Sequence, residues 1–193
     1  MNKIIRETDS CFREDFSNLL KKRKFDSNKL DSTVKVIIKK VIEESDEALI
    51  SYTKKFDKFE VKNFNQLIVS KKEIDYAYAK TNLKTIKAIK HAYQRIKSYH
   101  KRQVPKDEYY KDKDGVFLGS QWKPIDSVGL YVPGGTASYP SSVLMNAIPA
   151  MVSGVKRIVM VVPAPNGKIN PTILAVAKIL KISEIYKIGG AQA

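Results

Sequence analysis

The chain has 193 residues and a hydrophobic content of 43%, which is enough apolar material for a folded core and argues against wholesale disorder. Its longest strongly apolar run, residues 158–165, is far shorter than the ~20 residues that a membrane-spanning helix needs. No apolar segment of the signal-peptide type follows the N-terminus, and the single cysteine, Cys11, cannot form an internal disulfide. These features favour a reducing, cytoplasmic setting without a membrane partner.

The 35 Lys and Arg residues outnumber the 20 Asp and Glu residues, giving a formal net charge of +15. This excess is spread along the chain, with a net of +10 in residues 1–115 (28 basic, 18 acidic) and +5 in residues 116–193 (7 basic, 2 acidic). Only six of the basic residues are Arg, whose bidentate guanidinium is favoured for reading bases and phosphates. Lys interleaved with acidic residues is typical of solvated helix faces, so nucleic acid is the weakest of the partners that we consider.

Residues 1–126 are predicted to form a mainly helical N-terminal region. Apolar residues at helical spacing predict a helix over residues 32–44, and Ser45 is expected to cap the next helix through its side-chain oxygen. Residues 63–69 are expected to form a short extended connector. Ser70 and Glu73 have the spacing of a capping box, and we expect one long helix to follow and to end at Pro105. A polar loop is predicted for residues 106–115, and a hairpin or strand from Gly115.

Residues 127–193 are predicted to form a partial Rossmann-like domain. Their elements alternate as strand 127–132, helix 140–152 ended by Gly154, strand 157–162, a helix from Asn170-Pro171 to about residue 180, and strand 184–188. The second strand is apolar throughout, which predicts burial on both faces. A βαβαβ run of this kind predicts a parallel sheet with right-handed crossovers. The fold class is therefore α/β, a helical region followed by the first βαβαβ part of a Rossmann-like sheet.

Such a sheet favours a nucleotide ligand at the carboxyl ends of its strands, although the usual fingerprints are missing. Residues 134–138 do not match G-x-G-x-x-G, and Gly135 stands where a phosphate-binding P-loop requires Lys. Residues 161–164, at the end of the second strand, lack the acidic residue that usually binds the ribose hydroxyls. Any dinucleotide must therefore use other contacts.

Four residues near these strand ends are candidates for binding a cofactor. Gly134 and Gly135 permit positive φ and a close backbone approach, and their amides can face a phosphate; the alternative is a tight strand-to-helix turn. Tyr131 can stack on or bond to a ligand, or be an ordinary buried aromatic residue. Gln192 follows the third strand, where a side-chain amide can recognise a cofactor.

Candidates for catalysis and metal binding are poor. His91 and His100 lie nine residues apart on a predicted helix, and there is no zinc-type cluster of Cys and His. Cys11 has no evident activating partner, and no G-x-S-x-G motif is present. We assign no catalytic residue and no metal ligand in this chain.

Several motifs in the same order resemble the histidinol dehydrogenase family over residues 34–193. These are V-G-L-Y-V-P-G-G at residues 128–135, the helix at 143–155, G-G-A-Q-A at 189–193, and two upstream segments at 46–57 and 96–103. The resemblance implies a cytoplasmic, zinc-dependent homodimer that oxidises L-histidinol to L-histidine in two NAD-dependent steps, through histidinal, at the end of histidine biosynthesis.

By resemblance, Tyr131 and Gln192 match NAD-contacting positions, and the zinc ligands and the Glu-His acid–base pair lie further along the family sequence. The chain stops at Ala193, so we expect an N-terminal portion of the enzyme that is inactive alone. The alternatives are a non-catalytic dinucleotide-binding or dimerisation module and, less favoured, a basic nucleic-acid-binding protein.

Overall fold

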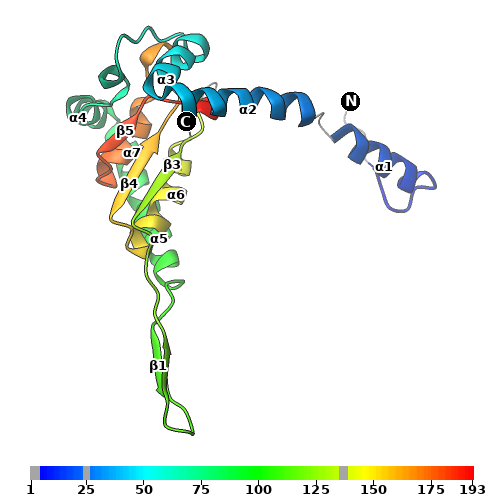
Figure 1. Cartoon of the computed structure of the whole chain (residues 1–193), viewed down its shortest axis with the longest axis vertical. Helices are drawn as coiled ribbons and strands as arrows, with labels where there is room; N and C mark the ends of the chain where they lie inside the picture. The colour runs from blue at the N-terminus through cyan, green and yellow to red at the C-terminus, as the bar shows by residue number, and fades with distance from the viewer. Residues whose placement is uncertain (1–4, 24–26, 135–138) are drawn as a thin grey trace.

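The structure is a computed structural model that describes residues 5–23, 27–134 and 139–193. A three-stranded parallel sheet forms the centre of the molecule, and two segments project from it, as Figure 1 shows. The strands are β3 (Ser127–Tyr131), β4 (Arg157–Val161) and β5 (Glu184–Tyr186), in the spatial order β3-β4-β5. This arrangement confirms the predicted βαβαβ run and its parallel sheet.

Two helices connect these strands. Helix α6 (Pro140–Ser153) ends at Gly154, whose φ of 93° is the left-handed conformation favoured after a helix, as predicted. Helix α7 (Pro171–Ile179) begins behind Asn170, whose side chain accepts a hydrogen bond from the backbone N–H of Thr172. Both helices begin with a proline, Pro140 or Pro171. Proline suits the first helical position because it has no N–H that would be left without a hydrogen-bond partner.

The central strand β4 is buried mainly on one face. Met160 is fully buried, whereas Val159 and Val161 are only partly buried. Alternate side chains of a strand point to opposite faces, so the helices cover the Met160 side of β4 more completely than the other. The prediction that this strand is buried on both faces is therefore confirmed for the Met160 face and only in part for the other face.

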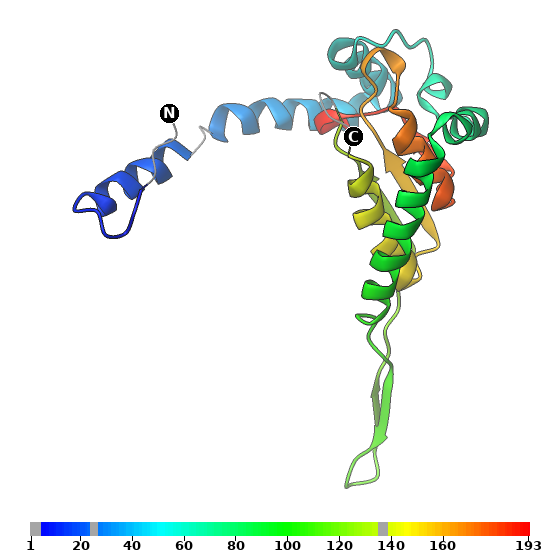
Figure 2. The same cartoon turned by 180° about the vertical axis from the view of Figure 1, so that it is seen from behind.

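A second layer of helices packs against α6 and α7. Helix α4 (Lys71–Lys80) contacts α7, and helix α5 (Leu83–Lys101) contacts α6. Figure 2 shows α5, in green, on the side of the molecule that faces the viewer. The capping box that starts α4 is present in full, with Glu73 N–H donating to Ser70 Oγ and Ser70 N–H donating to the Glu73 carboxylate. One hydrophobic core joins both layers to the sheet. This core contains residues from both sides of residue 126. The division into two domains at that residue stays a prediction.

The predicted single long helix after Ser70 is wrong. The chain breaks between α4 and α5, where Asn82 caps α5 by accepting a hydrogen bond from Lys84 N–H at 2.8 Å. A short 3₁₀ helix, η2 (Phe64–Leu67), also replaces most of the extended connector that we predicted before α4.

The N-terminal helices extend away from the sheet. They are α1 (Phe12–Arg23), α2 (Ser27–Glu44) and α3 (Asp46–Tyr52), and α3 continues into the π-helical turn η1 (Thr53–Asp57). In Figure 1, α2 projects sideways and α1 lies at its far end. The predicted side-chain cap at Ser45 is wrong: Ser45 N–H donates to Val41 O as a continuation of α2, and its φ of 49° differs from the extended geometry of a capping residue.

The second projection is an antiparallel hairpin of β1 (Glu108–Lys111) and β2 (Phe117–Ser120). The hairpin confirms the strand predicted from Gly115, but the predicted polar loop over residues 106–115 is wrong in part because it contains β1. All residues of both strands are exposed. The sequence of β1 therefore lacks the alternation of apolar and polar residues by which a half-buried strand is recognised.

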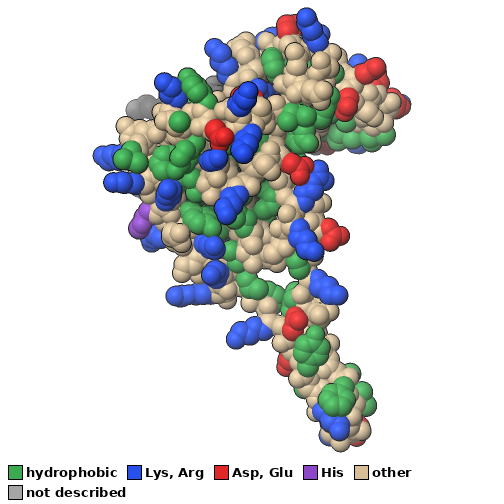
Figure 3. Space-filling model, turned by 90° about the vertical axis from the view of Figure 1, so that its left-hand side faces the viewer, with side chains coloured by type: hydrophobic (Ala, Val, Ile, Leu, Met, Phe, Trp, Pro, Cys, Tyr) green, Lys and Arg blue, Asp and Glu red, His purple; other side chains and the backbone are tan. Residues whose placement is uncertain are grey.

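Positive side chains are distributed over the face shown in Figure 3, among hydrophobic and acidic ones, instead of gathering in one patch there. Among the described residues, no helix is both long enough and apolar enough to cross a membrane.

Candidate functional site

The carboxyl edge of the sheet brings together the ends of β3, β4 and β5. Pro163 follows β4 and lies between the loops that leave the two outer strands. A Cβ atom built at Gly189 would lie 2.5 Å from Pro163 Cγ, and one built at Gly134 would lie 3.3 Å from the Pro163 side chain. Both glycines therefore allow backbone to approach the proline ring, and the three loops form a closely packed floor.

Gly134 lies close to the side chain of Pro163, and it is not among the glycines with positive φ. Its expected approach to a phosphate stays a prediction. Its neighbour Gly135 lies outside the described residues, so its expected contribution to phosphate binding stays a prediction.

Tyr131, at the end of β3, is 46% exposed, so it is not the ordinary buried aromatic residue that the sequence left as an alternative. Its phenol oxygen accepts a hydrogen bond from Gly190 N–H at 3.1 Å. This bond links β3 to the loop after β5, across the end of the central strand. Tyr131 thus combines a fixed phenol oxygen with an exposed ring.

Gln192 lies in the 3₁₀ turn η4 (Gly190–Gln192) and is only 4% exposed. Neither its side-chain oxygen nor its nitrogen has a hydrogen-bond partner among the described residues. The turn requires glycine at position 190, because φ is +69° there and a Cβ would lie 2.6 Å from Gln192 Oε1. A buried primary amide that lacks partners is costly, which makes this amide the strongest candidate for a ligand contact at this edge.

Asp57 was not among the candidate site residues chosen from the sequence, yet it lies beside Gln192. A cavity of about 250 Å³ is lined by Ile37, Phe56, Asp57 and residues 189–192. Asp57 is 9% exposed, its Oδ2 atom has no partner, and burial raises the pKa of its carboxyl. No local pattern marks this residue, because only the fold brings η1 next to the loop after β5.

The histidines do not form part of this site. His91 is exposed, and His100, in the last turn of α5, has its Nδ1 atom 2.6 Å from Gln103 Oε1. Within the described ranges no three His, Cys, Asp or Glu side chains are grouped to hold a metal ion. Cys11 is exposed and its thiol donates to the Asp15 carboxylate.

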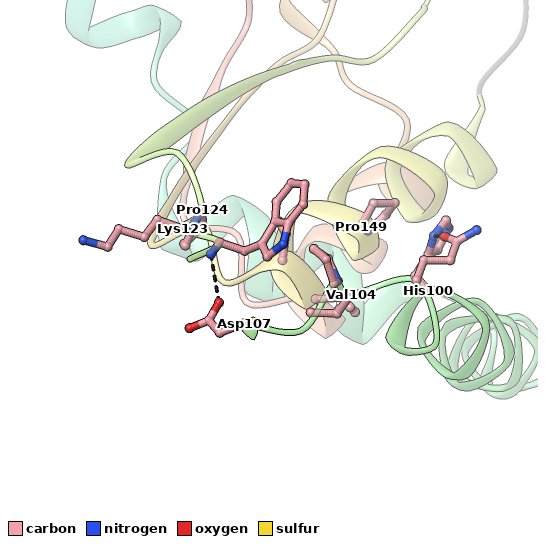
Figure 4. A pocket seen from close by; sticks show the side chains of 11 residues that line it. His100, Val104, Asp107, Lys123, Pro124 and Pro149 are labelled. Atoms are coloured by element: carbon pink, nitrogen blue, oxygen red, sulfur yellow. Dashed lines mark hydrogen bonds between the residues drawn. The ribbon is translucent and has the colours of Figure 1, made fainter. Parts of the chain in front are cut away.

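A second cavity, of about 400 Å³, lies at the other end of the sheet, where the hairpin joins β3 (Figure 4). His100, Val104, Pro124 and Pro149 contribute to its wall, and Asp107 accepts a hydrogen bond from Trp122 N–H at 2.8 Å. Parallel α/β sheets bind ligands at the carboxyl ends of their strands, so this cavity is the weaker candidate.

The carboxyl edge can bind and orient a polar ligand. It presents the Gln192 amide, which both donates and accepts, the Tyr131 phenol and the Asp57 carboxyl. Among the residues described, this edge offers no nucleophile paired with a base.

Known proteins agree with this description. The family model for histidinol dehydrogenase matches residues 20–193. The chain is 49% identical over 189 residues to a histidinol dehydrogenase of Brucella abortus and 50% identical over 189 residues to one of Mesorhizobium japonicum, in both cases covering 98% of this chain and 44% of the relative. A crystal structure of histidinol dehydrogenase from Elizabethkingia anophelis has a TM-score of 0.79 and 38% identity, covering 84% of this chain and 37% of that one.

The chain thus spans less than half the length of these relatives and corresponds to an N-terminal part of them. Because the family model covers most of its residues and the fold agrees, the chain belongs to the histidinol dehydrogenase family.

Proposed function

We propose that this chain supplies the dinucleotide-binding portion of a histidinol dehydrogenase, an oxidoreductase that converts L-histidinol to L-histidine through histidinal with NAD. The observation that carries the proposal is the buried Gln192 amide, which lacks partners at the carboxyl edge of a βαβαβ sheet. NAD, when bound, accepts the hydride that the oxidation releases.

The residues present fit a dinucleotide. Gln192 offers both a donor and an acceptor to a polar ring substituent, and Tyr131 offers an exposed aromatic face beside a fixed hydroxyl. The backbone of Gly134 and Gly135 is the expected place for phosphate oxygens, because these residues precede α6 in the sequence and helix N-termini bind anions.

The described residues contain no group of three or more His, Cys, Asp or Glu side chains that could bind the zinc ion of the family. We therefore assign no step of the reaction to zinc in this chain. The zinc ligands, the acid–base pair and the contacts to L-histidinol are proposed to belong to the portion of the relatives that this chain does not match. A cytoplasmic location and a homodimer are likewise proposed from the family.

Isothermal titration of the purified chain with NAD tests the binding role. We expect saturable binding that Gln192→Ala weakens by about tenfold or more, because a buried amide loses both of its ligand bonds. Gln94→Ala, which changes an exposed amide on α5, is the matched control. If Gln192→Ala binds NAD as tightly as the parent chain, the proposed site is wrong.

A second measurement tests the absence of turnover. We expect no reduction of NAD above background when L-histidinol is added to residues 1–193 alone. Activity that rises in proportion to the protein and disappears with a chelator would contradict this expectation.

A dimerisation module is the second candidate, because α2 carries apolar side chains that the described chain leaves uncovered. Val36, Ile38 and Ile42 are 64%, 45% and 75% exposed. Sedimentation equilibrium separates the outcomes, since a monomer at all concentrations would exclude self-association through α2.

A further inference from the structure

Three polar side chains are buried in the described part of the chain, namely Thr53, Asp57 and Gln192. Each has at least one side-chain atom without a hydrogen-bond partner. Asp57 and Gln192 line the same cavity, although they are distant in the sequence. Buried polar groups are normally paired, so two that share a cavity and lack partners point to one ligand that contacts both.

Asp57 stands on backbone that departs from regular helix. It is the last residue of the π-helical turn η1, and Lys58 after it has a φ of 53°, in the left-handed region. Single π-helical turns are found disproportionately at functional sites, and left-handed conformations of non-glycine residues cost free energy that the surrounding structure must offset. This local geometry places the carboxyl of Asp57 at the cavity wall.

The burial of Asp57 opposes its ionisation. Removal from water raises the pKa of its carboxyl, and no Lys, Arg or His among the described residues forms an ion pair with it. A structural role would leave the carboxyl with fixed donors from the protein. Oδ2 instead has none, which is the state expected of an acceptor kept for a ligand.

Dinucleotide-binding sheets usually hold the ribose with an acidic residue after the second strand, whose two oxygens accept from the ribose hydroxyls. The residues after β4 in this chain are Val162, Pro163 and Ala164, all of them buried or partly buried and none acidic. Asp57 brings a carboxyl to the same edge of the sheet from the helical region, beside residues 189–192.

Resting on the proposed NAD-binding role, we propose that Asp57 accepts hydrogen bonds from a ribose diol of the dinucleotide, replacing the acidic residue that the second strand lacks. Gln192 holds a neighbouring polar group of the same ligand. The carboxyl thus contributes to recognition of the sugar, and the site is assembled from η1 and η4.

The test pairs changes in the protein with changes in the ligand. Binding of NAD is compared with binding of two analogues, one lacking the 2′-hydroxyl of the adenosine ribose and one lacking the 2′-hydroxyl of the nicotinamide ribose. The parent chain is expected to bind one of these analogues about tenfold or more weakly than NAD. Asp57→Ala is expected to bind NAD and that analogue equally, because the acceptor is gone.

Asp57→Leu keeps about the volume of the side chain without any acceptor and serves if Asp57→Ala does not fold, with the same loss of discrimination expected. Asp31→Ala, which removes an exposed carboxyl from α2, is the control and should discriminate as the parent chain does. A merely structural role for Asp57 would shift affinity for NAD and both analogues by the same factor.

The outcomes separate the two proposals. Binding of NAD that depends on Gln192 but is unchanged in both Asp57 variants overturns the role of Asp57 and leaves the proposed function standing. Equal binding of NAD and both analogues by the parent chain also overturns it. If the parent chain does not bind NAD at all, the proposed function fails and the ribose contact fails with it.

Discussion

The phenol oxygen of Tyr131 and the backbone nitrogen of Gly190 lie 3.1 Å apart, joined by a hydrogen bond between the end of β3 and the loop after β5. The bond passes the end of β4, where Pro163 is packed against Gly189. The turn that carries Gln192 is therefore fixed from two sides, by a side-chain hydroxyl and by the ring of a proline.

Removing the Tyr131 hydroxyl should loosen this turn. Tyr131→Phe leaves Gly190 N–H without its acceptor and is expected to lower the free energy of unfolding by about 0.5–1.5 kcal/mol, as measured by urea denaturation. Affinity for NAD should fall several-fold in a titration. Tyr76→Phe is the control, because Tyr76 is 66% exposed and its hydroxyl faces solvent. Equal effects of the two substitutions would show that the bond to Gly190 has no special part.

Gly189 should not tolerate a side chain. A Cβ at this position would lie 2.5 Å from Pro163 Cγ and 2.9 Å from Pro163 Cα, so backbone must move. Gly189→Ala is expected to destabilise the chain by about 1–3 kcal/mol in urea denaturation. Gly129→Ala in β3 is the matched control, since no atom lies within 4 Å of its Cβ position. If Gly189→Ala is as stable as Gly129→Ala, the loops around Pro163 can accommodate a Cβ atom at position 189 without a measurable loss of stability.

Asp57 should make stability depend on pH in an unusual direction. Burial raises the pKa of its carboxyl above the usual 3.8, so the folded chain holds this proton when the unfolded chain has lost it. The contribution of Asp57 to stability therefore falls as pH rises from about 3.8 through the folded pKa, and the penalty persists at higher pH. Asp57→Asn should be more stable than the parent at pH 7, and this advantage should vanish below pH 3.8. Denaturation at a series of pH values measures the difference, and an advantage that does not change with pH would refute the assignment.

Glu73 should act in the opposite direction. Its partial burial alone would raise the pKa, but the hydrogen bonds from Lys187 and Ser70 outweigh this effect and hold the pKa of Glu73 below its usual 4.5. Its stabilisation is present above pH 4.5 and is lost as pH falls through the folded pKa. We expect Glu73→Ala to cost about 1 kcal/mol at pH 7, chiefly through loss of the capping box.

A second variant separates the two roles of Glu73. Glu73→Gln can still accept from Ser70 N–H but loses the charge that pairs with Lys187, whose Nζ lies 2.5 Å from Glu73 Oε1. Glu73→Gln should lose less free energy of unfolding than Glu73→Ala. The loss that it does show comes from the ion pair with Lys187 and should become smaller at high salt. If both variants lose the same free energy, the cap contributes little.

The sequence predicted those elements whose signals are local. The capping box of Ser70 and Glu73, the glycine that ends α6 and the Asn170-Pro171 start of α7 each depend on residues within a few positions of one another. The break before α5 escaped prediction because the apolar spacing continues past it, and Asn82 competes for the backbone there. Strand β1 escaped because both of its faces are exposed, so burial left no alternation to recognise.

The candidate site divides along the same line. Tyr131, Gly134 and Gln192 could be selected because each follows a predicted strand, and parallel strands end at one edge. Asp57 and Pro163 could not be selected in this way. Asp57 reaches the cavity only through the packing of the helical region against the loop after β5. Pro163 contributes by packing against two glycines, Gly134 and Gly189, that are distant from it in the sequence.

The two margins of the sheet differ, and amide hydrogen exchange should record the difference. Residues 67–69 close the outer margin of β5, where Val69 N–H donates to Ile185 O and Lys187 N–H donates to Leu67 O. β3 is the opposite edge strand, with Val132 N–H bonded inward to Val161 O. Because successive amides of a strand alternate in direction, Tyr131 N–H points outward. Deuterium should therefore enter at Tyr131 long before it enters at its neighbour Val132 or at Lys187.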